Sequence, residues 1–76
     1  MSPVIQSILL NKDKFTLKQA VNYMVKHNYL VEKVDETDKF YRFRQVTPSL
    51  LKKNGYTTFR TKVIVPNEIE FIFAYR

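Results

Sequence analysis

Only one segment of this chain, residues 16–28, has the hydrophobic period of an α-helix, and the apolar residues on both sides follow strand-like patterns. The apolar residues of the segment recur at spacings of three and four and would form one stripe: Leu17, Ala20, Val21, Met24 and Val25. Thr16 and Gln19 have the spacing of a capping box, and Asn28 suits the left-handed position after a last helical turn. We therefore predict one main helix over residues 17–27.

The other apolar runs predict strands, because they are short and β-branched or alternate between apolar and polar residues. They are residues 4–10, 29–34, 39–46, 57–65 and 69–75. A polar, mostly acidic turn at residues 35–38 joins the second and third predicted strands into a hairpin. Residues 47–55 begin with Thr-Pro and end with Asn-Gly, which is typical of a single helical turn or an ordered loop. The expected class is α+β: one main helix packed on a mainly antiparallel sheet, in the order β-α-β-β-(short helix)-β-β.

The last two predicted strands are joined by residues 66–68, and their register decides which side chains share a face. A two-residue loop would set Lys62 opposite Phe71. A three-residue loop keeps apolar residues together, and we prefer it: it pairs Val65 with Ile69, Val63 with Phe71 and Phe59 with Tyr75. The opposite face of the first of these strands would then hold Thr58, Arg60, Lys62 and Ile64.

A chain of 76 residues with 45% apolar content and no cysteine is expected to form one small basic domain, residues 1–76, without disulfides. Thiol catalysis, iron–sulfur clusters and cysteine-ligated zinc are excluded. His27 is the only histidine, and its place at the end of the predicted helix favours a structural role. Since no nucleophile–base pair or glycine-rich phosphate loop can be assembled, we expect no enzyme, no cofactor and no small-molecule substrate.

The net charge of +6 is concentrated in one part of the chain. Residues 1–38 hold five basic and five acidic side chains, whereas residues 39–67 hold seven basic and no acidic ones. Such an asymmetry points to a polyanionic partner.

If the strands at 40–46 and 58–64 aligned their basic faces, they would form one cationic surface. Its predicted members are Arg42, Arg44, Lys52, Lys53, Arg60 and Lys62, with Phe40 as an aromatic side chain that can stack on an unpaired base. Nucleic-acid binding through six phosphate contacts would give a log–log salt dependence with a slope of about −4 to −5. Two alternatives stay open: the same face binds an acidic protein surface or a second copy in an assembly, or it only keeps the protein soluble.

Two further features favour ordinary structural roles. Asp35, Glu36 and Asp38 lack the spacing of a calcium loop and are typical of a solvated turn. Tyr23 lies off the apolar stripe, so we expect it at a sheet edge or a subunit contact.

The chain shows neither a signal peptide nor an apolar run of the roughly 20 residues that span a bilayer. The lack of a signal peptide is inferred from residues 1–14. We expect an intracellular or particle-associated protein, neither secreted nor membrane-spanning.

Residues 33–37 (KVDET), 41–45 (YRFRQ), Pro48 and 59–62 together resemble a small, mostly uncharacterised domain of large DNA virus and tailed phage proteins. The resemblance covers about residues 15–76 and departs at Pro66-Asn67-Glu68, where such sequences have a glycine-containing turn. It implies a viral origin, a place in the cytoplasm or nucleus of the host cell or within a virus particle, and a virion-structural or genome-associated role. It carries over no catalytic residue.

Overall fold

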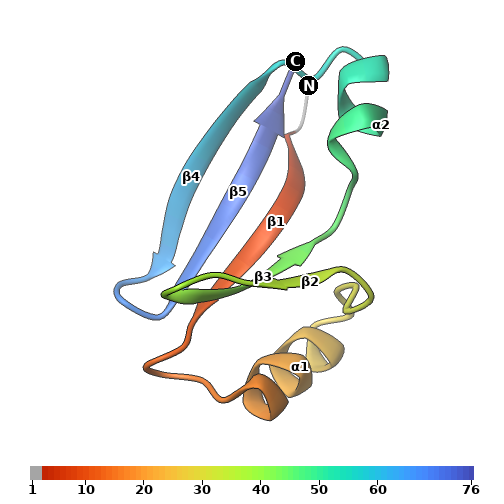
Figure 1. The fold of residues 1–76 in the computed structure, drawn as a ribbon. Coiled ribbons are helices and arrows are strands. Elements are labelled where there is room, and N and C mark those ends of the chain that lie inside the picture. Colours follow the sequence, from red (N-terminus) through yellow and green to blue (C-terminus); the bar gives the residue numbers. More distant parts are fainter. Residues whose placement is uncertain (1–2) are drawn as a thin grey trace.

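The computed structural model describes residues 3–76 and confirms the predicted α+β class and order of elements (Figure 1). The elements are β1 (Val4–Asn11), α1 (Leu17–Lys26), β2 (Val34–Glu36), β3 (Phe40–Arg44), α2 (Pro48–Lys53), β4 (Thr58–Val65) and β5 (Ile69–Tyr75). The strands form one antiparallel sheet in the order β2-β3-β1-β5-β4. Met1 and Ser2, part of the segment examined for a leader, lie outside the described residues.

Helix α1 begins where the capping box predicts. The Gln19 backbone N–H donates to Thr16 Oγ1 at 3.2 Å, and the Thr16 N–H donates to Gln19 Oε1 at 2.9 Å, so two N–H groups without helical partners are satisfied. The helix ends at Lys26, one residue before the predicted end, with His27 as C-cap and Asn28 at φ 62°. Asn28 thus takes the predicted left-handed position.

The core lies between α1 and one side of the sheet, which we call the helix face; the other side is the far face. Ala20 and Met24 of α1 are fully buried against strand residues. Those strand residues are Ile8, Leu10, Phe43, Ile69 and Phe71. Tyr23 also packs against this core although it lies off the predicted apolar stripe, and its role at a sheet edge or a subunit contact stays a prediction. The buried stripe of α1 is centred on Ala20 and Met24 and is rotated toward Tyr23 relative to the predicted stripe. As a result, Leu17 is 46% exposed and Val25 is 58% exposed.

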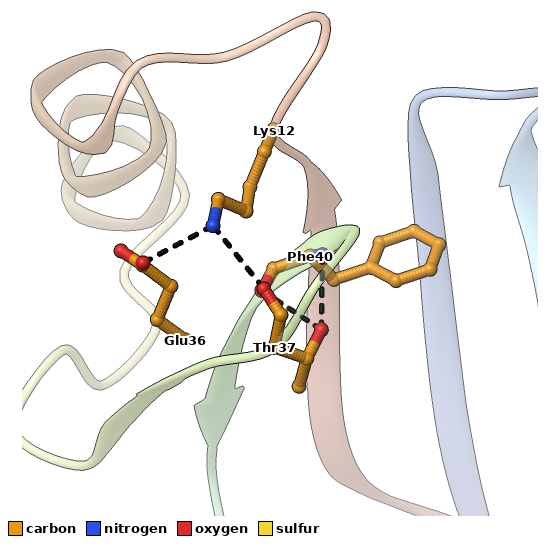
Figure 2. A network of polar contacts seen from close by, with 4 residues as sticks. All are labelled: Lys12, Glu36, Thr37 and Phe40. Atoms are coloured by element: carbon orange, nitrogen blue, oxygen red, sulfur yellow. Dashed lines mark hydrogen bonds and ion pairs between the residues drawn. The ribbon is translucent and has the colours of Figure 1, made fainter.

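The β2–β3 hairpin is shorter than predicted. Residues 29–31 are extended but not paired as a strand, because they lead the chain off α1: the Tyr29 N–H donates to the Met24 carbonyl, and the Leu30 N–H to Gln45 Oε1. Asp35 and Glu36 therefore lie in β2 and not in the turn. Figure 2 shows the turn itself, where Lys12 Nζ contacts Glu36 Oε2 at 3.1 Å and the Thr37 carbonyl at 3.2 Å.

The predicted register of the β4–β5 hairpin is right at the turn and wrong beyond it. Val65 pairs with Ile69, but the next pair is Val63 with Glu70, because Ile64 is an extra residue that bulges from β4. A bulge shifts the alternation of all later side chains by one position. Lys62 therefore lies opposite Phe71, the pairing that was assigned to the rejected two-residue loop.

The short helix α2 is confirmed, with Thr47 as N-cap and Pro48 in the first turn. Its Leu51 is buried, and Pro48 faces a hollow that it shares with Phe59 and Ile72 of the far face. Helices α1 and α2 thus pack on opposite sides of the sheet. Within residues 3–76, neither helix has the length and apolar content that crossing a bilayer requires.

Candidate nucleic-acid interface

The structure does not assemble the single cationic surface that the sequence predicts. Strands β3 and β4 lie in the same sheet, but β1 and β5 separate them. Arg42 pairs with Leu9, next to Ile8 of the core, so its side chain lies on the far face. Arg60 pairs with Phe73, which packs against the core, so its side chain lies on the helix face. The register shift in β4 is the reason that Arg42 and Arg60 lie on opposite faces of the sheet.

The other predicted site residues do not form one surface: some make contacts within the chain, and others lie on α2. Arg44 Nη2 lies 3.5 Å from Asp35 Oδ2, and Arg42 donates hydrogen bonds to Ser7 and Gln6. Phe40 is partly buried, and in Figure 2 its ring points away from the Lys12–Glu36 pair. The exposed side chains of Lys52 and Lys53 belong to α2.

On the helix face, the structure places two of the predicted cations next to aromatic rings of β5. Across the β4–β5 pair, Arg60 lies opposite Phe73 and Lys62 opposite Phe71. Phe71, Phe73 and Tyr75 form an aromatic row along β5, with ring centroids 6.0 Å and 6.5 Å apart. Phe71 is buried, whereas Phe73 and Tyr75 are partly exposed and both cations are exposed.

The aromatic row continues toward the end of α1. The Tyr29 ring contacts Phe71 edge-on with centroids 5.9 Å apart, and His27 stacks on Tyr29 at 6.3 Å. The ring centroids of Tyr23 and His27 lie 4.4 Å apart. The pKa of Tyr23 is raised above 10.0, first by burial and then by the neighbouring Tyr29. His27 thus lies within a chain of aromatic side chains.

Among residues 3–76, Arg60 and Lys62 form no ion pair. Strand β4 has no carboxylate, and the single carboxylate of β5, Glu70, pairs with Val63 and points to the far face. In the part of the chain that the structure describes, the two ion pairs join Lys12 to Glu36 and Arg44 to Asp35. A pair of free cations beside partly exposed rings is an arrangement that attracts phosphates and allows bases to stack.

Sequence reasoning missed Phe73 and Tyr75 as site residues, although a signal for them exists. Alternation along the strand puts both on the same face as Phe71, the face that packs against the helix. A helix of 10 residues is about 15 Å long, whereas a strand of 7 residues spans about 24 Å. Figure 1 shows α1 at one end of the sheet, while β5 runs on toward the C-terminus beyond it. The short helix therefore leaves the end of the aromatic row partly open.

No protein-family profile, no curated protein and no solved structure matches this chain. The resemblance to the viral and phage domain therefore stays a prediction. Among residues 3–76, no three side chains of the types that hold metal ions lie together. The carboxylates of Asp35 and Glu36 contact Arg44 and Lys12, respectively.

Proposed function

We propose that the protein is a non-enzymatic module that binds single-stranded nucleic acid along the β4–β5 edge of the helix face. The observation that carries the proposal is the register of this strand pair, which sets Arg60 beside Phe73 and Lys62 beside Phe71. Phe73 and Tyr75 would stack on bases, and Arg60 and Lys62 would contact phosphates. The proposal replaces Phe40, Arg42, Arg44, Lys52 and Lys53 as the main contact residues, since these do not join the same surface.

The physical basis is the combination of stacking and charge. Base stacking on an aromatic ring contributes about 1–3 kcal/mol per base and tolerates any sequence, because every base has a π-face. Paired bases in a duplex are already stacked on each other and cannot reach these rings. We therefore expect a preference for single strands and little sequence specificity.

The test is fluorescence anisotropy with labelled single-stranded and double-stranded oligonucleotides of DNA and RNA, at about 50 and 300 mM salt. We expect single strands to bind more tightly and the double variant Arg60→Gln/Lys62→Gln to lose most of this affinity. The matched control is Lys52→Gln/Lys53→Gln, which removes the same charge from α2 and should bind nearly as well as the unmodified protein. Equal losses in both double variants, or no binding at the lower salt, would contradict the proposal.

A second candidate function is protein–protein assembly, in a virus particle if the sequence resemblance is right. It is favoured by Phe59 and Val63, which are 49% and 53% exposed on the far face of the edge strand β4. An exposed edge strand with apolar side chains is a surface on which another chain can dock. Light scattering tests it: a defined oligomer that Val63→Lys converts to a monomer would support assembly.

A further inference from the structure

We infer that the far face carries a second binding site, for a small molecule in which a carboxylate or phosphate is attached to a flat apolar body. The site is a hollow of about 360 Å³ between α2 and the sheet. Its lining residues are Gln6, Arg42, Pro48, Phe59, Thr61 and Ile72. It lies on the opposite side of the sheet from Arg60 and Lys62, so it does not rest on the proposed nucleic-acid surface.

The cation of this hollow, Arg42, is held in place by a bulge in β1. The register of β1 with β5 shifts between Ile5 and Ser7, and Gln6 joins Ser7 in binding the guanidinium. Gln6 and Ser7 are 3% and 0% exposed, and the Ser7 hydroxyl donates to Gln6 Oε1 at 2.7 Å. Arg42 Nε donates to Ser7 Oγ at 3.3 Å and Nη2 to Gln6 Oε1 at 3.4 Å. A buried polar pair therefore fixes one edge of the guanidinium.

The rest of the guanidinium has no anionic partner in the chain. Among residues 3–76, neither of the ion pairs involves Arg42, and its remaining N–H groups make no hydrogen bond to protein atoms. Its neighbour Arg44, by contrast, contacts Asp35. Guanidinium groups bind carboxylates and phosphates through paired, charge-assisted hydrogen bonds, and a fixed guanidinium loses little entropy in doing so. An oxyanion is thus the group that Arg42 is prepared to bind.

The walls of the hollow select the body of the ligand. Phe59 offers an aromatic ring that is about half exposed, and Pro48 and Ile72 add apolar surface on the other sides. Binding sites for small molecules typically have volumes of about 300–1,000 Å³ and combine apolar walls with a few fixed polar groups. At about 360 Å³ this hollow suits a ligand with one or two rings. The site departs from the sequence-based expectation that no small molecule would be bound.

The experiment is a titration of the isotope-labelled protein followed by two-dimensional amide NMR, with four probes. Benzoate and phenyl phosphate carry both features, benzyl alcohol lacks the charge, and acetate lacks the ring. We expect benzoate or phenyl phosphate to shift the amides of the hollow saturably, with Kd on the order of 1 mM, and the other two probes to bind at least about tenfold more weakly. The stronger of the two anions shows whether the site is built for carboxylate or phosphate.

Two variants connect the binding to Arg42. Arg42→Gln should lower the affinity for the preferred anion by about tenfold or more. Arg44→Gln removes the same charge from the same strand and should change this affinity by less than about twofold. If Arg42→Gln disturbs the fold, Thr61→Leu replaces it as the test. The leucine side chain fills the hollow from the exposed strand β4 and should cause the same loss of affinity with Arg42 intact. The variant Arg60→Gln/Lys62→Gln should still bind the anion, so this proposal and the nucleic-acid proposal can fail separately.

Three results would overturn the inference. The first is the absence of any saturable shift, and the second is equal binding of benzyl alcohol together with an unchanged affinity in Arg42→Gln. The third is a set of shifts centred on Arg60 and Lys62, because the anion would then bind the helix face.

Discussion

Phe73 has two roles in this structure: its ring packs against the core and also borders solvent beside Arg60. We expect Phe73→Leu to weaken binding of single-stranded oligonucleotides by about 5- to 150-fold, because one stacked base contributes about 1–3 kcal/mol. Leucine keeps the apolar contact with the core, so the variant should fold. The measurement is fluorescence anisotropy, and Phe59→Leu on the far face is the matched control. Equal affinities of the two variants would remove Phe73 from the interface.

Tyr23 gives the stability of the protein a pH dependence above neutrality. Its pKa is raised above 10.0 in the folded state, first by burial and then by Tyr29, so the unfolded chain loses this proton at a lower pH than the folded chain does. The associated stability is fully present below the unfolded pKa of about 10 and is lost as the pH rises through the folded pKa.

Urea unfolding between about pH 9 and 11 measures this effect. We expect the free energy of unfolding to fall with pH more steeply in the unmodified protein than in Tyr23→Phe, which has no phenolic proton to lose. Parallel curves would show that Tyr23 is not responsible.

At the scale of single elements, α1 depends on its capping box because it is short and has no acidic residue in its first turn. Thr16→Ala removes the hydroxyl that accepts from the Gln19 N–H. We expect it to lower the free energy of unfolding by about 1 kcal/mol, the usual contribution of an N-cap. Thermal or urea unfolding checks the value, with Thr58→Ala on an exposed strand position as control. A loss no larger than that of the control would mean that the helix start is set by packing alone.

The last two strands show which features of an element follow from local signals and which do not. The range Ile69–Tyr75 and the start of α1 follow from local alternation and capping, and both are confirmed. The bulge at Ile64 leaves no local signal, since a β-branched residue fits a regular strand as well as a bulged one. That one unpaired residue moved Arg60 and Lys62 to the other side of the sheet.

At the scale of the whole molecule, the six predicted phosphate contacts are distributed over the two faces of the sheet and helix α2. Of the six predicted phosphate contacts, the helix face of β4 keeps two, Arg60 and Lys62. We therefore expect the logarithm of single-strand affinity to fall with the logarithm of salt concentration with a slope of about −1.4. The earlier surface of six cations requires about −4 to −5.

Anisotropy titrations over a series of salt concentrations distinguish these slopes. The variant Arg60→Gln/Lys62→Gln should bring the remaining slope close to zero. A steep slope that survives in this variant would mean that cations from both faces contact the nucleic acid.

The sequence by itself determined the fold class, the place of the helix and its cap, the short α2 turn and the concentration of positive charge in residues 39–67. These properties depend on neighbours along the chain, through periodicity, capping and turn chemistry. The tertiary structure alone decided the strand order, the two bulges and the length of sheet that α1 covers. Those depend on contacts between residues far apart in sequence, and they determine which charges meet which rings.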